Sequence, residues 1–327
     1  MGTTRKEAPP ADMGLPRQWS ERVRLCIGAL WIISGLLMFQ PLTRSPLFFT
    51  DVLAPVAEAW QPFALRSLLH AGNSWWLISP GIWPLAIGAV ELAGGAVIWW
   101  NPKHAPQVFR SAVYGLTAWS LVVWVMGEGF GNLFNGTGSV LDGTPGTALL
   151  YGACTALLLI PPQSWADGSV AYRVRQAVAW MWIMMAGLQA LPGAGFWQGA
   201  RLAELFGLVT MNGSEPAWLQ RIISQSVMVS FHDPVLVNAL LVLIMLGVGI
   251  AWLVNWRHAP LATLLWVLWL WAIPQAFGAL WTHVAPTPGM IGPWLVLIEL
   301  ARRHLPASAR LSPGKASAAG QTPGTRA

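Results

Sequence analysis

The chain has 327 residues, of which 55% are hydrophobic and only 10% are charged. Soluble domains carry roughly 25% charged residues, so this composition excludes an ordinary soluble domain and predicts an all-α integral membrane protein. The net charge of +6 does not indicate a nucleic-acid partner, because the basic residues gather on one side of the predicted spans, as the positive-inside rule describes for membrane proteins.

In chain order, residues 1–20 come first; they are polar and contain prolines, and we predict that they form a disordered cytoplasmic tail. Apolar runs of approximately membrane-spanning length follow and predict eight transmembrane helices. The end of the chain, 307–327, is rich in Ser, Ala, Gly and Pro and is predicted to be a second disordered cytoplasmic tail. The apolar runs lie at approximately 25–41, 77–100, 111–130, 145–161, 176–192, 234–256, 261–280 and 289–305.

The chain contains an internal repeat, because landmarks of its first half return in the same order in its second half. The repeat predicts two tandem four-helix bundles, 21–162 and 173–306. Since each bundle holds an even number of spans, the two have a parallel orientation in the membrane. The matched landmarks are Arg22-Val23-Arg24 with Arg173-Val174-Arg175, Trp31 with Trp182, Phe130-Gly131 with Phe277-Gly278, and Thr144-Pro145-Gly146 with Thr287-Pro288-Gly289.

The positions of the charges predict the orientation of the chain. If the N-terminus is cytoplasmic, fifteen of the nineteen Lys and Arg residues lie in cytoplasmic segments and only four lie outside. Because basic loops remain on the cytoplasmic side, we expect a multi-pass protein with both termini in the cytoplasm. The four outer basic residues are Arg44, Arg66, Arg201 and Arg221.

Two long external segments, 42–76 and 193–233, are where the halves differ most. In the second segment, Leu202, Leu205 and Phe206 fall on one face of a predicted helix, which suggests an interfacial helix on the outer leaflet. Two interpretations stay open for these segments: they are caps over the bundle, or they form a platform for a substrate or partner.

Glu91 lies within the apolar run 89–100. An isolated carboxylate in hydrocarbon costs several kcal/mol, so we expect Glu91 to face the bundle, to be protonated or to have a partner. It is a candidate proton or quinone-contact group, with helix packing as the alternative. The matching residue of the second half is Met245, so any function of Glu91 is confined to the first half.

Glu128 lies at the outer end of the third span, among Gly127, Gly129 and Gly131. Glycines allow close approach of backbone to another helix or to a ligand, so Glu128 is the second candidate; a solvated surface carboxylate is the alternative. No pair of histidines has metal-ligand spacing, and no metal site is predicted. Near the end of the last span, Glu299 has two arginines three and four residues later, which predicts an ion pair.

These features together resemble a known family. A unit that opens with a basic residue and a Trp-bearing helix, and continues with Glu91-Leu92-Ala93-Gly94-Gly95, resembles the DoxX/DoxD-like superfamily of small bacterial membrane proteins. The resemblance covers about 22–161 and, in degenerate form, 173–305. That family includes the membrane subunit of thiosulfate:quinone oxidoreductase. It implies a bacterial cytoplasmic membrane protein associated with a quinone or a redox partner protein, with at most one redox-linked site per chain. Glu91 and Glu128, singled out above from their surroundings in the sequence, are the catalytic candidates for that site.

Two other classes of function stay open. The sequence contains no flavin, haem or iron–sulfur motif, so no cofactor is evident, and electron chemistry would require a quinone or a partner protein. The chain is alternatively a transporter or channel for a small solute, with a path between the halves. The third alternative is a noncatalytic scaffold in the lipid bilayer that binds a partner through its external segments.

Overall fold

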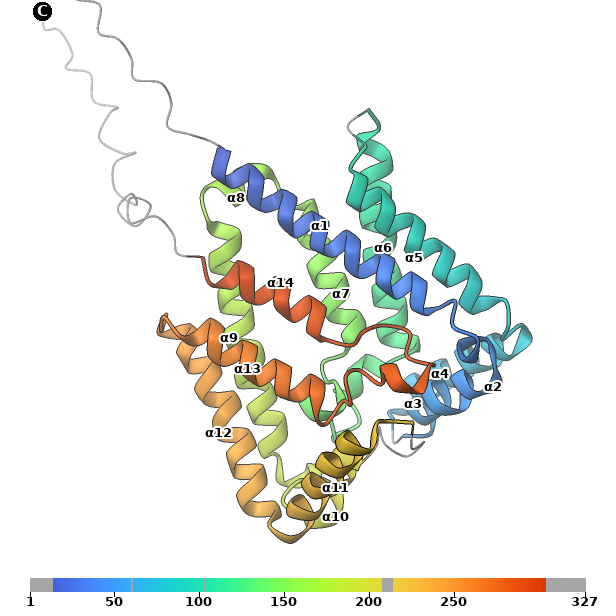
Figure 1. The fold of residues 1–327 in the computed structure, drawn as a ribbon, viewed down its shortest axis with the longest axis vertical. Coiled ribbons are helices and arrows are strands. Elements are labelled where there is room, and N and C mark those ends of the chain that lie inside the picture. The colour runs from blue at the N-terminus through green and yellow to red at the C-terminus, as the bar shows by residue number, and fades with distance from the viewer. Residues whose placement is uncertain (1–13, 60, 103, 208–213, 304–327) are drawn as a thin grey trace, which may run out of the picture.

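The computed structural model describes residues 14–59, 61–102, 104–207 and 214–303. Within these ranges the regular structure is helical and no strand is assigned, which confirms the predicted all-α class (Figure 1). Residues 1–13 and 304–327, which make up most of the two predicted tails, lie outside the described ranges.

The first half contains four helices within the predicted apolar runs, and a segment of further helices lies between the first two. The four helices are α1 (Gly14–Leu37), α5 (Trp83–Trp100), α6 (Pro106–Met126) and α7 (Thr147–Ala156), the last extended by η5 (Leu157–Leu159). The other elements are η1 (Leu42–Arg44), α2 (Pro46–Phe48), η2 (Phe49–Leu53), α3 (Ala54–Glu58), α4 (Phe63–Ile78), η3 (Gly129–Asn132) and η4 (Val140–Asp142).

The second half has the same order of helices. After the connecting helix α8 (Pro162–Ala166), the helices within the predicted apolar runs are α9 (Ser169–Ala190), α12 (Pro234–Leu253), α13 (Ala259–Ala272) and α14 (Ile291–Ala301). The remaining elements are η6 (Pro192–Ala194), α10 (Gly199–Gly207), α11 (Ala217–His232) and η8 (Leu280–Thr282).

Each of the eight predicted apolar runs contains a helix, but these helices differ in length and polarity. Within the described residues, α5, α6 and α12 are long and apolar enough to cross a membrane by themselves. The apolar helices Thr147–Leu159, α13 and α14 are shorter. The helices α1 and α9 carry arginines in their first halves. The structure therefore supports membrane association through a few apolar helices.

Glycines bring the backbones of α1 and α5 into direct contact. A Cβ atom at position 95 would lie 2.8 Å from the Ile32 nitrogen and 3.0 Å from the Gly28 oxygen. One at position 35 would lie 2.8 Å from the Gly88 oxygen. These distances are shorter than side chains tolerate, so the small residues set the separation of the two helices, as at many membrane helix interfaces.

The pair α9 and α12 crosses in the same way. A Cβ atom at Gly249, the residue that matches Gly95, would lie 2.9 Å from the Ala179 oxygen. Ala179 follows Gly28 by 151 residues, as Trp182 follows Trp31. Both helix pairs thus come into close backbone contact at a glycine.

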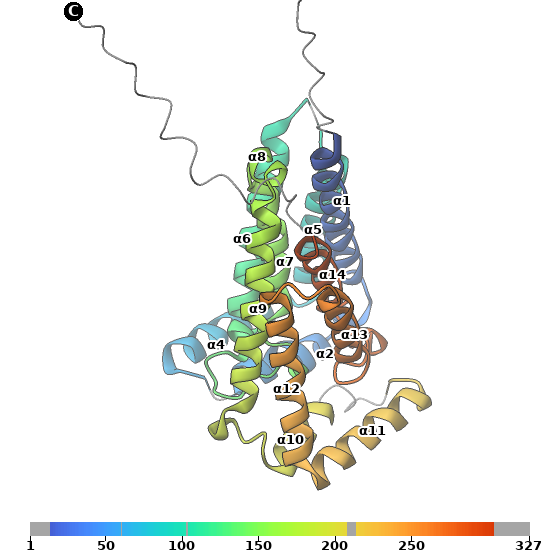
Figure 2. The same cartoon turned by 90° about the vertical axis from the view of Figure 1, so that its left-hand side faces the viewer.

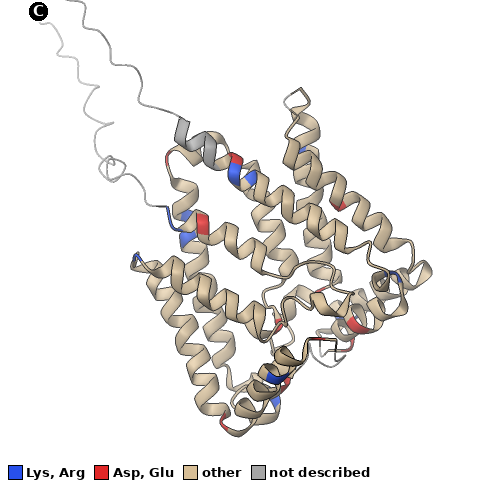
Figure 3. Ribbon diagram, viewed as in Figure 1, with Lys and Arg blue, Asp and Glu red and all other residues tan. Residues whose placement is uncertain are grey.

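Several basic residues lie where α1 begins and α14 ends, while others lie elsewhere, including on α10 and α11 (Figure 3). Arg24 donates from Nη1 to the Ile98 oxygen at 2.7 Å and also to the Trp99 oxygen, which joins the start of α1 to the end of α5. The ion pair predicted for Glu299 is confirmed, with Arg302 and with Arg303, whose Nη2 lies 2.7 Å from Glu299 Oε1.

The amphipathic helix expected around Leu202, Leu205 and Phe206 is present as α10, which lies with α11 at the end of the molecule away from α8 (Figures 1 and 2). Its apolar residues Leu202, Leu205 and Phe206 are buried, and α10 packs on α11 and α12. The apolar face therefore covers protein, as the cap interpretation requires; it does not lie against lipid.

The glycine contacts can be tested with a matched pair on α12. Gly249 meets the α9 backbone, whereas a Cβ atom at Gly247 would meet no atom within 4 Å. We expect Gly249→Val to destabilise the protein by about 1–3 kcal/mol through overpacking. Thermal unfolding in detergent is the measurement. Gly247→Val is the control, and an equal loss of stability in both variants would contradict the close crossing.

Candidate functional site

A cavity of about 630 Å³ lies between the first helical unit and the loop 275–289 of the second. We call it the outer cavity. Its walls come from α1, α4, α5 and α6, from the segment 48–56 and from the loop 142–148. Both candidate residues, Glu91 and Glu128, line it, so the structure brings together two carboxylates that are far apart in the sequence. The rings of Trp31, Phe48, Trp75, Trp76, Trp119 and Tyr151 line the same space.

Glu91 is held in the outer cavity by the packing of its own helix. Gly88 and Gly95 lie on the same face of α5, because residues three and four apart are neighbours on a helix. Since both glycines press against α1, Glu91 is directed into the bundle, and only 6% of its surface is exposed. The expectation that Glu91 faces the bundle is confirmed.

Side chains on two neighbouring helices donate hydrogen bonds to the Glu91 carboxyl group. Trp119 on α6 donates from Nε1 to Oε1 at 2.9 Å, and Ser34 on α1 donates from Oγ to Oε2 at 2.8 Å. The Ser34 oxygen also lies 3.2 Å from the carbonyl oxygen of Pro286. A hydroxyl has a single proton to donate. Ser34 therefore donates either to Glu91 or to Pro286.

Glu128 lies outside α6, which ends at Met126. Its two carboxyl oxygens accept from the Ala148 nitrogen at 3.1 and 3.2 Å, in the first turn of α7. The positive end of a helix dipole suits a carboxylate. A side chain at Gly146 would collide with Glu128 Oε2, so glycine is required there. The close backbone approach expected around Glu128 is thus provided, and its partner is the start of α7.

Asp142 and Asp51 also line the outer cavity, and neither was predicted from the sequence as a site residue. Asp142 Oδ1 accepts from the Thr144 nitrogen at 3.2 Å, from the Thr144 hydroxyl at 2.9 Å and from the Ser139 nitrogen at 3.3 Å. Burial nevertheless raises the pKa of Asp142 to about 6. The capping pattern Ser139-x-x-Asp142 was a signal for this local structure, but only the fold shows that the turn faces the cavity.

The second half closes the outer cavity but repeats neither of its glutamates. Gln275, which matches Glu128, donates from Nε2 to the Val140 oxygen at 3.2 Å. Met245, which matches Glu91, is fully buried. Trp266 matches Trp119, and its Nε1 has no hydrogen-bond partner within the described part of the chain. The second half therefore supplies a wall of the site in the first.

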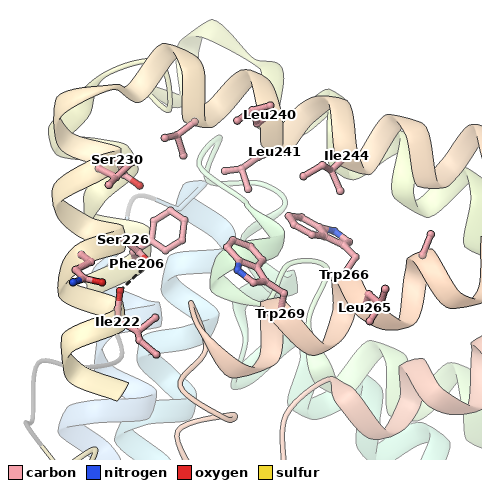
Figure 4. A pocket seen from close by; sticks show the side chains of 14 residues that line it. Phe206, Ile222, Ser226, Ser230, Leu240, Leu241, Ile244, Leu265, Trp266 and Trp269 are labelled. Carbon is pink, nitrogen blue, oxygen red and sulfur yellow. Dashed lines mark hydrogen bonds between the residues drawn. The ribbon is translucent and has the colours of Figure 1, made fainter. Parts of the chain in front are cut away.

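A separate groove of about 680 Å³ lies in the second half (Figure 4). Phe206, Trp266 and Trp269 line it together with aliphatic side chains of α11 and α12, and its polar residues are Gln225, Ser226 and Ser230. Among the residues that the structure describes, no charged one lines this groove. We therefore place the candidate site in the outer cavity, which combines aromatic rings with carboxyl groups.

Among the described residues, no group of three or more His, Cys, Asp and Glu side chains gathers in a way that would hold a metal ion. Comparison with models of protein families, with curated proteins and with solved structures finds no match to this chain. The resemblance to DoxX/DoxD-like proteins rests on the sequence features quoted above.

Asp142→Asn tests the electrostatics of the site. Asn keeps one oxygen, and Oδ1 alone accepts the hydrogen bonds of Asp142, so we expect the variant to fold. The pKa of Asp142 is raised from 3.8 to about 6, so ionisation costs the wild type stability as the pH rises through this range. The stability of the variant relative to the wild type should therefore increase from pH 4 to pH 6 and level off above. Thermal unfolding across this range is the measurement, and a pH-independent difference would count against a buried Asp142.

Proposed function

We propose that this chain is a DoxX/DoxD-like protein of the bacterial cytoplasmic membrane, with eight spans in two tandem four-helix units and both termini in the cytoplasm. In this proposal, its outer cavity binds a quinone, and a redox partner protein supplies the electrons. Glu91 holds a proton next to the quinone ring, and Glu128 lies on the entry side. One observation carries the proposal. Glu91 belongs to a helix that is apolar enough to cross a membrane, and its side chain lines a cavity with aromatic walls.

The proposal of two tandem units is supported by local geometry that occurs twice. Trp124 donates from Nε1 to the Pro145 oxygen at 2.7 Å, and its ring meets Phe130 edge to face at 4.9 Å. Trp271 donates to the Pro288 oxygen at 2.8 Å, and its ring meets Phe277 edge to face at 4.8 Å. Phe130 with Phe277 and Pro145 with Pro288 are matched landmarks of the repeat, and Trp271 follows Trp124 by 147 residues, as Phe277 follows Phe130. Such agreement is what a duplication leaves behind.

The size and lining of the outer cavity suit a quinone ring. Its volume of about 630 Å³ falls within the roughly 300–1,000 Å³ typical of small-molecule sites. Aromatic side chains can stack on a flat ring. When bound, a quinone supplies the two-electron chemistry, while the protein binds the ring, excludes water and holds a proton at the Glu91 carboxyl group.

The hydrogen bonds of Ser34 support a proton-holding role for Glu91. An ionised Glu91 accepts the Ser34 proton at Oε2. A protonated Glu91 can instead donate to the Ser34 oxygen, which frees Ser34 to donate to the Pro286 oxygen 3.2 Å away. Both states of the carboxyl group thus find partners without any movement of the helices.

A transporter for a small cationic solute is the second candidate. It is favoured by Glu91, Glu128 and Asp142, which line one continuous cavity from the middle of α5 to the loops. Uptake into sealed vesicles separates this candidate from the quinone site. Equal uptake with and without the protein would exclude transport of the solute tested.

Replacement of Glu91 by Gln tests the leading proposal. We expect Glu91→Gln to weaken binding of decylubiquinone by about ten-fold, because an amide cannot exchange the proton and the loss of one good contact is worth about 1.4 kcal/mol. Quenching of tryptophan fluorescence in proteoliposomes is the measurement.

Glu58→Gln is the matched control, since Glu58 is an exposed acid that does not line the cavity. Unchanged binding of decylubiquinone by Glu91→Gln would show that Glu91 does not contact the quinone. Absence of binding to the wild type would refute the quinone proposal.

A further inference from the structure

The outer cavity has exposed residues in its lining, and these mark its openings. Trp75 on α4 and Val122 on α6 both line the cavity, yet their exposed fractions are 51% and 48%. Side chains that line the cavity and are also exposed connect its lining with the surface of the molecule. One opening of the cavity therefore lies between α4 and α6.

This mouth faces lipid. Val122 belongs to α6, which is long and apolar enough to span a membrane, so its exposed side meets hydrocarbon. Trp75 stacks on Trp83 with ring centroids 3.8 Å apart, and Trp83 begins the membrane-spanning candidate α5. Paired tryptophans at the end of a span are typical of the interface between hydrocarbon and headgroups. The mouth thus lies at the outer edge of the hydrocarbon layer.

Asp51 marks a different opening. It lines the cavity, it is exposed, and it belongs to the external segment rather than to a long apolar helix. A ligand dissolved in water would meet the charged side at Asp51, whereas a ligand dissolved in the bilayer would meet the apolar side at Trp75 and Val122.

We infer that the ligand enters the outer cavity sideways from the outer leaflet, through the mouth between α4 and α6, and that it is a ring compound with an apolar tail. The inference rests on the proposed function and adds its route and substrate class. The ring reaches Glu91 and Trp119, while the tail stays at the mouth in contact with lipid. Met126 on α6 lies against Gly72 on α4 at the edge of the mouth, where its flexible side chain acts as a gate.

A matched pair on α6 tests the route. Leu121 is exposed to nearly the same degree as Val122, 46% against 48%, but it does not line the cavity. We expect Val122→Phe to narrow the mouth and to slow association of decylubiquinone by about ten-fold, whereas Leu121→Phe leaves the rate unchanged. Stopped-flow fluorescence with the full chain in proteoliposomes is the measurement.

A reversible crosslink provides a second variant. A Cβ atom at position 72 would lie 4.0 Å from the Met126 Cβ atom, within the roughly 3.5–4.5 Å that a disulfide spans. Oxidation of the double variant Gly72→Cys, Met126→Cys should fix α4 to α6 and slow entry of decylubiquinone. Reduction should restore the rate, and each single cysteine variant is the control.

The outcomes separate the inference from the proposed function. The tailless quinone 2,3-dimethoxy-5-methyl-1,4-benzoquinone should associate at the same rate with the wild type and with Val122→Phe, because it can enter from water. Equal slowing of both quinones, or equal rates for Val122→Phe and Leu121→Phe, would overturn lateral entry while the quinone site remains. If neither quinone binds the wild type, the proposed function fails and the inference falls with it.

Discussion

The close contact between the backbones of α1 and α5 is the constraint on which the candidate site depends. Gly28 and Gly35 on one helix meet Gly95 and Gly88 on the other, so the two backbones approach each other closely at these positions. Glu91 lies on that face between Gly88 and Gly95. Its carboxyl group must therefore extend along the helix interface, where Ser34 and Trp119 reach it. A carboxyl group at this depth is tolerated because both of its oxygens are hydrogen-bonded.

The second half contributes a wall to the site but none of the carboxyl groups that line it. It repeats the close crossing at Gly249 and the bond from Trp271 to Pro288. It lacks the acids, and its loop 275–289 lies over the cavity of the first half. Gln40 strengthens this contact by donating from Nε2 to the Ala285 oxygen at 3.1 Å. The second half thus completes the wall of the cavity in the first half.

Several features of the site followed from residue type and local spacing. An acid inside an apolar helix had to find partners, and Glu91 has two. Glycines around Glu128 indicated a close backbone approach, which the start of α7 makes. The amphipathic pattern at Leu202 identified the buried face of α10, but it did not distinguish lipid from protein as the neighbour. Asp142 was missed because an Asp-Gly turn has the same local pattern whether it faces a cavity or solvent.

The sequence by itself determined the helical class, the apolar runs, the repeated landmarks and the asymmetry of the two acids between the halves. These properties depend on composition and on residues close together along the chain. Only the tertiary structure decided that Glu91, Glu128 and Asp142 share one cavity, that Trp119 and Ser34 bind Glu91, and that the second half covers the first. Such contacts join residues distant in sequence, and they depend on how the helices cross, which no local pattern specifies.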